Sequence, residues 1–233
     1  MTSIRCLKLA EVPLERLRVC RAFPLASILV TAAPVIALVS WLWWTHGDDP
    51  IRGTQQALDA VRHGNGLLLA FGALFWSMAA NDVRKALRAT GWLAAFDAQS
   101  LFVKWRSYQN AHWGTDDVQV VQVPLASLRS ARVLSRWWTT PDGRHGGGRS
   151  EPACYVELTL AADIDVAGLA RHLADERAGK PGGRSVGWKG MWGDVPLSVE
   201  QDSVLRIRWR ARPSAARFVA ELAAHGVAHL GVE

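Results

Sequence analysis

Four arginines alternate with apolar residues near the end of the sequence, in the stretch VLRIRWRAR. They are Arg206, Arg208, Arg210 and Arg212. Because successive side chains of a strand point to opposite faces, Leu205, Ile207 and Trp209 would occupy one face and the arginines the other. A row of like charges on one face needs either cross-strand carboxylates, such as Glu157 or Glu200, or an acidic surface on a binding partner. The sequence is compatible with both interpretations.

Two further groups of residues could contact such a partner. Arg84, Lys85 and Arg88 follow an uncharged run in NDVRKALRA. Trp188 and Trp192 lie in the glycine-rich stretch GWKGMWG. A core position is difficult to arrange for a tryptophan in such a stretch, so we expect these two rings to be exposed contact residues. Other tryptophans add candidate contact surface: Trp105, Trp113, Trp137 and Trp138. Of these, Trp105 is expected to pack in the core.

The residue types that most often perform catalysis or bind metals are not grouped in the sequence. None of the seven histidines lies in an H-x-H, an H-E-x-x-H or a His/Cys cluster with ligand spacing. Cys6, Cys20 and Cys154 form no C-x-x-C pair. Asp165 is explained as the N-cap of a helix, and the stretches GKPGGRS and GRHGGGRS lack the spacing of a P-loop. We therefore expect a protein that is not an enzyme, with no catalytic residue, no metal and no cofactor.

The positive charge of the chain is weak evidence for nucleic acid as a partner. The net charge is +6 and the pI is about 9.7. Much of this charge flanks two long uncharged stretches, where basic residues are explained by the orientation of membrane segments. Nucleic-acid binding would instead need the arginine row together with aromatic rings that stack on bases.

These two uncharged stretches predict a membrane anchor. The first, Phe23 to Trp44, reaches the roughly 20 apolar residues that a helix needs to cross the hydrocarbon layer, and it ends in tryptophans typical of the headgroup level. The second, Gly64 to Asn81, is near the lower limit of length. We interpret the pair, within residues 22–89, as a transmembrane hairpin. A retained signal anchor is the alternative for the first stretch, and an interfacial segment for the second.

Positive charge near the stretches predicts their orientation. Basic residues precede the first stretch and follow the second: Arg5, Lys8, Arg16, Arg18, Arg21, Arg84, Lys85 and Arg88. The connecting loop has only Arg52 and Arg62, which aspartates offset. We therefore expect a multi-pass protein of the cell inner membrane, with residues 1–21 as a cytoplasmic N-terminal segment and with both termini in the cytoplasm.

Residues 90–233 form one region of ordinary domain size in which apolar and polar residues alternate. The alternation predicts strands in GWLAAFDAQ, LFVKWRSYQ, VQVVQVPLASLRSARVLSRWW, ACYVELTL, VPLSVEQ and SVLRIRWRAR. A short helix capped by Asp165 and a last helix that opens at Pro213 and stops at Gly226 complete the pattern. The expected fold class is α+β: a transmembrane hairpin, then a mainly antiparallel β domain with an inserted short helix and a C-terminal helix.

Short antiparallel strands closed by one amphipathic helix resemble the bacterial pleckstrin-homology-like (bPH) domain membrane proteins, in which one or two hydrophobic helices precede such a domain. The resemblance is carried by GWLAAFDAQSLFVKWRS, VVQVPLASLRSARV and VLRIRWRARPSAARFVAELAAHG, and it spans Thr90 to Gly226. It implies a cytoplasmic PH-like barrel or sandwich. The insertion from Ile164 to Asp194 departs from this family, whose strands are joined there by short turns.

A tethered domain without catalytic groups is expected to act as an interaction or regulatory module. Its partner would be anionic headgroups of membrane lipids, or a protein that adds a strand to an exposed sheet edge. The expected contact residues are the basic and aromatic ones: Arg84, Lys85, Arg88, Arg206, Arg208, Arg210, Arg212, Trp188 and Trp192. The alternatives are a membrane-tethered nucleic-acid-binding protein, and an enzyme that acts on a lipid or a small polar substrate.

Overall fold

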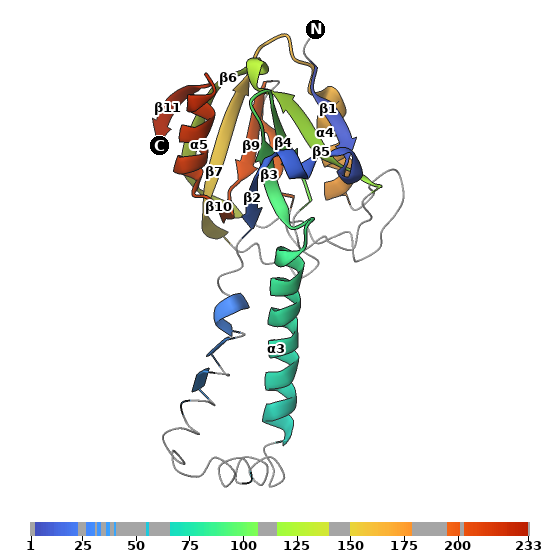
Figure 1. Ribbon diagram of the computed structural model, residues 1–233, viewed down its shortest axis with the longest axis vertical. Coiled ribbons are helices and arrows are strands. Elements are labelled where there is room, and N and C mark those ends of the chain that lie inside the picture. The colour runs from blue at the N-terminus through green and yellow to red at the C-terminus, as the bar shows by residue number, and fades with distance from the viewer. Residues whose placement is uncertain are drawn as a thin grey trace. The chain divides into compact units, whose positions relative to one another are not determined.

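The computed structural model describes two compact units of the chain. The described residues are 3–22, 66–106, 116–139, 150–178, 195–200 and 203–232, with helical residues at 27–30, 32–33, 36–37, 40 and 55. The first unit, called the β domain below, combines Met1–Phe23 with Ala89–Glu233, and the second is Pro24–Arg88. All described strands belong to the β domain, whereas α3 (Gly66–Leu87) belongs to the second unit (Figure 1).

The β domain contains two sheets. The first has the order β1-β5-β4-β3-β2-β10 and is antiparallel. Its strands are β1 (Arg5–Lys8), β2 (Arg18–Ala22), β3 (Trp92–Phe96), β4 (Ser100–Lys104), β5 (Val118–Pro124) and β10 (Ala211–Arg212). The second has the order β11-β6-β7-β9-β8 and is antiparallel except for β11, which runs parallel to β6. Its strands are β6 (Leu128–Thr139), β7 (Ser150–Leu160), β8 (Leu197–Glu200), β9 (Val204–Arg208) and β11 (Ala228–Val232).

The chain passes directly between the sheets at two places. A 3-10 turn at Leu125–Ser127 joins β5 to β6, where the Ser127 hydroxyl donates to the carbonyl of Pro124 at 2.6 Å. Trp209 and Arg210 join β9 to β10. Alternate apolar side chains from both sheets enter one core: Val121, Val123, Val156, Leu158, Leu160, Leu205 and Ile207. The strands that the alternation predicts within residues 90–233 are confirmed where the structure describes them, except that SVLRIRWRAR is divided into β9 and β10 of different sheets.

The last helix, α5 (Ala215–Ala224), packs into this core with its apolar stripe. The backbone amide of Arg217 donates to the hydroxyl of the N-cap residue Ser214, and Phe218, Val219 and Leu222 are buried. The ring of Phe218 stacks on Trp209 at a centroid distance of 4.3 Å. The crossing between sheets at Trp209 and the last helix thus stabilise one another.

The inserted helix, α4 (Ala167–Arg177), also belongs to the core. Asp165 was predicted to be its N-cap, but the N-cap residue is Val166, and Asp165 Oδ1 accepts a hydrogen bond from the amide of Ala167. Leu169 and Leu173 are almost completely buried. On the same helix, Glu176 is a buried acceptor for Arg106 Nε at 2.8 Å. Because these contacts join α4 to the core that both sheets share, this helix is an integral part of the β domain.

Strands at the beginning of the chain complete the first sheet. Residues 1–21 were expected to be a segment separate from the β domain, but β1 pairs with β5, and β2 lies between β3 and β10. Leu9 and Val12, which follow β1, form a second apolar cluster with Trp92 and Phe102. These strands are short and carry charged residues, so the sequence pattern alone does not reveal them.

The prediction of a transmembrane hairpin is wrong. In the described part of the chain, no helix is long and apolar enough to cross a membrane. The uncharged stretch that ends at Asn81 does not coincide with its helix, because α3 continues through Asp82, Arg84 and Lys85 to Leu87 and its last turns are polar. Within Phe23 to Trp44, the described helical stretches have four residues or fewer, and the remaining residues lie outside the described ones.

The predicted location of the protein is corrected together with the hairpin. A multi-pass inner-membrane protein with cytoplasmic termini depended on two spanning helices, and the described residues contain no such helix. A spanning helix must keep about 20 successive apolar residues in one continuous element, which an uncharged stretch of sequence does not guarantee. The α+β class with two sheets remains, without the transmembrane part.

Candidate interaction surface

The row of four arginines is divided between the two sheets. Arg206 and Arg208 belong to β9 of the second sheet, whereas Arg212 belongs to β10 of the first. Arg210 lies in the crossing between the two strands. The single continuous face that a straight strand would give is therefore not formed.

Arg206 is neutralised by carboxylates across the second sheet. Glu157 of β7 lies opposite Arg206 on one side and Arg132 of β6 on the other. Its two oxygens contact Arg132 Nη2 at 2.6 Å and Arg206 Nη2 at 2.9 Å, and Glu200 lies 3.4 Å from Arg206 Nη1. Burial raises the pKa of the Glu157 carboxyl, but hydrogen bonds from Arg206 and Arg132 outweigh this effect and lower it. For Arg206, the cross-strand interpretation is confirmed.

The other basic candidates have different environments. Arg208 is buried opposite Tyr155, whereas Arg210 and Arg212 are exposed. In the second unit, Arg84 is exposed and Lys85 half-buried in the last turn of α3, and Arg88 is exposed just after it. Trp188 and Trp192 lie outside the described residues. The structure thus brings only Arg206 and Arg208 of the expected contact residues together on one strand.

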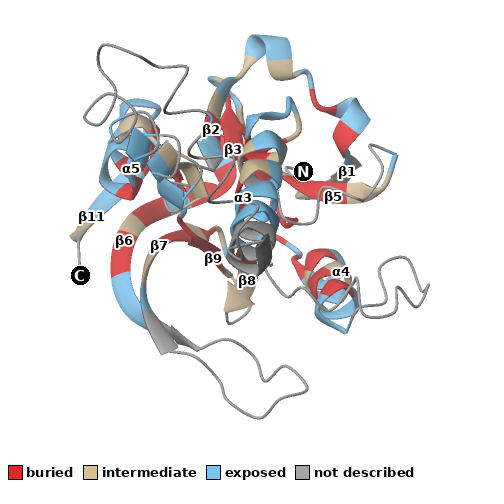
Figure 2. Ribbon diagram, turned by 90° about the horizontal axis from the view of Figure 1, so that it is seen from below, coloured by how far each residue is buried: buried red, intermediate tan, exposed pale blue. Residues whose placement is uncertain are grey.

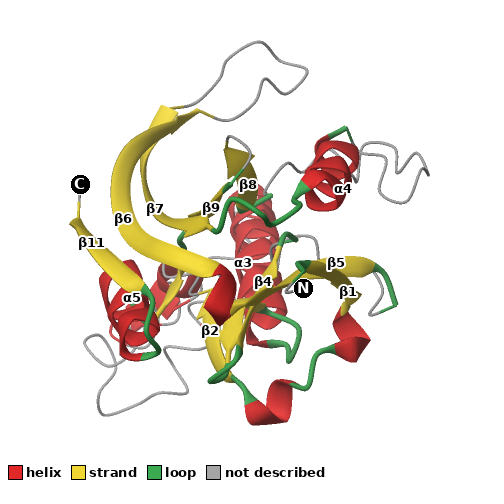
Figure 3. Ribbon diagram, turned by 90° about the horizontal axis from the view of Figure 1, so that it is seen from above, coloured by secondary structure: helices red, strands yellow, loops and turns green. Residues whose placement is uncertain are grey.

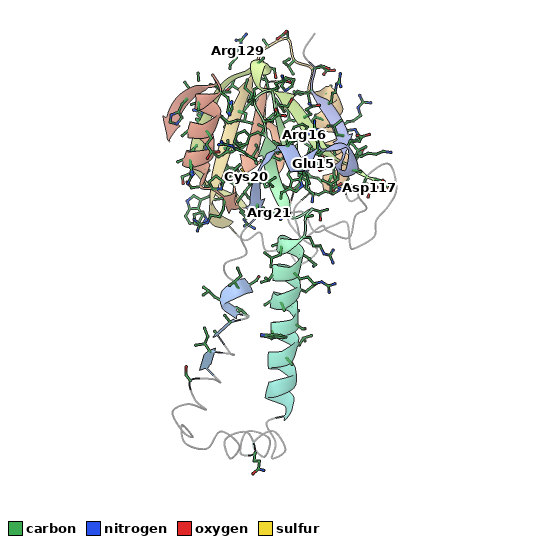
Figure 4. All side chains as sticks on the ribbon, in the orientation of Figure 1. Glu15, Arg16, Cys20, Arg21, Asp117 and Arg129 are labelled. Carbon is green, nitrogen blue, oxygen red and sulfur yellow. The ribbon has the colours of Figure 1, made fainter. Side chains whose placement is uncertain are left out.

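Two cations of the first sheet, Lys104 and Arg106, are buried. Lys104 Nζ donates to the carbonyl of Thr90 at 2.8 Å. Burial, with a smaller contribution from the charge of Arg106, lowers the pKa of Lys104 to about 8. Arg106 contacts Glu176 of α4 at 2.8 Å and Asp117, which is labelled in Figure 4, at 3.5 Å. These contacts hold the start of β3 and helix α4 in place, and they leave neither cation at the surface.

An open depression of about 560 Å³ lies where α5 ends. It is lined by the turn between β3 and β4, the 3-10 turn before β6, and the end of α5: Ala98, Gln99, Ser100, Pro124, Leu125, Ala126, Leu128, His225 and Gly226. The ring of His225 packs edge-on against Phe96, with centroids 5.9 Å apart. No group of three or more metal-ligating side chains occurs among the residues that the structure describes. The polar side chains of its lining are Gln99, Ser100 and His225.

The most exposed part of the second sheet is the far end of β6 and β7. Strand β9 pairs with β7 only from Tyr155 to Thr159, and β11 pairs with β6 only from Ser130 to Val133. Beyond these limits β6 and β7 continue as a two-stranded ribbon, in which Leu134–Thr139 pairs with residues 150–155. Figures 2 and 3 show both strands running on past β9 and β11. We call this segment the β6–β7 ribbon.

An aromatic and a basic side chain are displayed on this ribbon. Trp137 is 72 % exposed, the largest value among the large apolar side chains described in the β domain. Its neighbours Ser135 and Arg136 are exposed as well. Because Arg136 and Trp137 are consecutive in a strand, they point to opposite faces of the ribbon. Trp137 is one of several tryptophans in the sequence, and no signal there distinguishes it from those that are buried.

Comparison with known proteins found no match: no family model, no curated protein and no solved structure is similar to this chain.

Proposed function

We propose that the β domain is a non-catalytic interaction module that binds another protein through the β6–β7 ribbon. The observation that carries this proposal is the exposure of Trp137 on a strand whose flanking strands end before it. An exposed indole is costly in water and gains most when a partner covers it, and tryptophan and arginine dominate the binding energy of protein interfaces. Arg136 beside it supplies a positive charge for orientation.

The distribution of arginines favours a protein over an anionic lipid surface or nucleic acid. Both of these polyanions are recognised by several cations that face the same way. Here the arginine row is divided between the sheets, Arg206 is paired with two carboxylates, and Arg208 is buried. A partner that covers one indole and neutralises one or two charges agrees better with this surface.

The resemblance to PH-like domains remains a prediction. Two antiparallel sheets with a C-terminal amphipathic helix, α5, in their shared core are the features in its favour. The integral helix α4 and the N-terminal strands β1 and β2 are additions to the plan that the sequence suggested.

The proposal is tested by placing the photo-crosslinker p-benzoylphenylalanine at position 137 in the full chain, in its native cell, and identifying the attached protein. The affinity of that purified protein is then measured for wild type, Trp137→Ser and Leu87→Ser. We expect Trp137→Ser to weaken binding at least about tenfold, as for a central interface tryptophan. Leu87 of α3 is a matched control because its exposed fraction is 73 %.

Equal weakening by both substitutions would contradict the proposal, because the effect would then not be specific to the ribbon. Binding of wild type to vesicles with anionic headgroups, or to an oligonucleotide, with no cross-linked protein at position 137, would also contradict it. In that case the domain would bind its partner through its charges and not through the indole of Trp137.

A further inference from the structure

Along the ribbon, one edge of β6 has no strand beside it among the residues that the structure describes. On its other side β6 pairs with β7 over its whole length, from Leu128 to Thr139. On the open side, the only described strand is β11, and its register stops at Val133. The N–H and C=O groups of Leu134–Thr139 that point away from β7 therefore have no described strand beside them. Such an edge is a template for an additional strand.

Strand β11 shows that this edge accepts a strand. It runs parallel to β6 and places Ala228 opposite Ser130 and His229 opposite Ala131. Its register then shifts between His229 and Val232, where Gly231 has a φ of +86°, and the strand ends. This irregularity ends the pairing where the open part of β6 begins. At the opposite edge of the same sheet, α4 contacts β8, and Arg177 Nη2 donates to the carbonyl of Leu197 at 3.3 Å.

The side chains along the open edge define what an added strand must carry. Trp137 presents an indole on one face and Arg136 a guanidinium on the other, and both are exposed. Residues 134–139 contain no acidic residue. A strand beside them would gain from an apolar side chain next to Trp137 and a carboxylate next to Arg136, which means apolar and acidic residues in alternation. A second copy of this chain is a poor occupant, because its own Arg136 would face a like charge.

We infer that an extended segment of a partner protein, with alternating acidic and apolar residues, adds to β6 at Leu134–Thr139 as the next strand of the sheet, in line with β11. Main-chain hydrogen bonds to β6 hold this segment, and Trp137 and Arg136 select it. The inference rests on the proposed function and specifies the mode of binding and the chemistry of the partner.

The test uses the purified full chain and the labelled peptide acetyl-(Glu-Val)4-amide. Three comparison peptides are used: (Lys-Val)4, (Glu-Val)4 with N-methylated valines, and (Glu-Val)4 with N-methylated glutamates. Each methylated peptide lacks the N–H donors along one of its two backbone edges. We expect (Glu-Val)4 to bind, (Lys-Val)4 to bind at least about tenfold more weakly, and one of the two methylated peptides to lose binding to a similar extent. Amide exchange of residues 134–139 should slow when (Glu-Val)4 is bound.

Variants separate the strand-addition mode from other modes. Arg136→Glu should reverse the preference, so that (Lys-Val)4 binds more tightly than (Glu-Val)4. Arg171→Glu, which changes another exposed arginine, on α4, should leave the preference unchanged. Both results are independent of whether the native partner has been identified.

Three outcomes would overturn the inference. Equal binding of both methylated peptides would show that side chains alone are recognised, and the proposed function would survive if the protein cross-linked at position 137 still depends on Trp137. Absence of binding by (Glu-Val)4 would show that such a strand does not add to β6, and here too the proposed function would survive if the protein cross-linked at position 137 depends on Trp137. A concentration-dependent dimer that protects residues 134–139 from amide exchange would show that a second copy occupies the edge.

Discussion

At Glu157 one buried carboxylate lies between two guanidinium groups, those of Arg132 and Arg206, on three neighbouring strands. This arrangement pairs the arginines of this face with a carboxylate within the sheet. A second compensated group joins Arg106 to Glu176 and Asp117. At the scale of single residues, these arginines stabilise the fold, whereas Arg136 and Trp137 on the ribbon are exposed.

Lys104 gives the stability of the β domain a specific pH dependence. Its pKa is lowered from 10.5 to about 8 in the folded protein, so above pH 8 the unfolded chain binds more protons than the folded one. The free energy of unfolding therefore rises with pH in this range. Above pH 9 the buried thiol of Cys20, whose pKa burial raises from 9.0 to about 12, acts in the opposite direction.

We predict that this rise between pH 8 and pH 9, measured by urea unfolding, is lost in Lys104→Met. Cys20→Ala serves as the control and should retain it, because the Cys20 thiol contributes above that window. Identical slopes in wild type and Lys104→Met would show that Lys104 is protonated equally in the folded and unfolded chains.

At the scale of elements, α4 connects an insertion to the core of two sheets. We predict that Leu173→Ala lowers the free energy of unfolding by about 3 kcal/mol, because the leucine is almost fully buried and its removal leaves a cavity. Leu230→Ala, on β11, is the matched control and should change it by less than about 0.5 kcal/mol, since that leucine is 61 % exposed. Chemical denaturation measures both. A loss at Leu173 no larger than at Leu230 would contradict the integral role of α4.

The predictable elements were those with a long, regular alternation. Within residues 90–233, alternating apolar residues marked β3 to β9, and capping residues marked α4 and α5. Strands β1, β2 and β11 were missed because charged residues, a histidine or a glycine interrupt their apolar alternation. The sequence also places four arginines on one face, since periodicity does not reveal that the chain changes sheets at Trp209. Trp137 is exposed because β6 extends beyond the strand that pairs with its other edge. The sequence pattern does not show where neighbouring strands end relative to one another.

At the scale of the whole molecule, the second unit is inserted into a β-hairpin. Arg21 of β2 lies opposite Trp92 of β3, so the chain leaves the β domain at the end of one strand and returns at the start of its neighbour. The β domain is thus formed by two separate parts of the sequence, Met1–Phe23 and Ala89–Glu233. Neither part contains all strands of the first sheet.

We predict that residues 89–233 alone do not fold to the native state. They lack β1 and β2, and Trp92 and Phe102 lose their contacts with Leu9 and Val12. A chain in which an Asn-Gly turn replaces residues 24–88 should fold cooperatively, because such a turn closes a hairpin between paired strands. Dispersed amide NMR spectra and a cooperative thermal transition distinguish the two. A native spectrum for 89–233 alone would contradict this division of the chain.

The pairing of β2 with β10 has a consequence for synthesis. Arg21 and Ala22 find their partners Arg212 and Ala211 only after those residues have left the ribosome. Until then the edge of β2 that pairs with β10 has no partner strand. Contacts this distant in sequence make folding slow. The first sheet therefore acquires β10 only after residues 211 and 212 have been synthesised, and a chaperone that shields the N-terminal strands during that interval should raise the yield of folded protein.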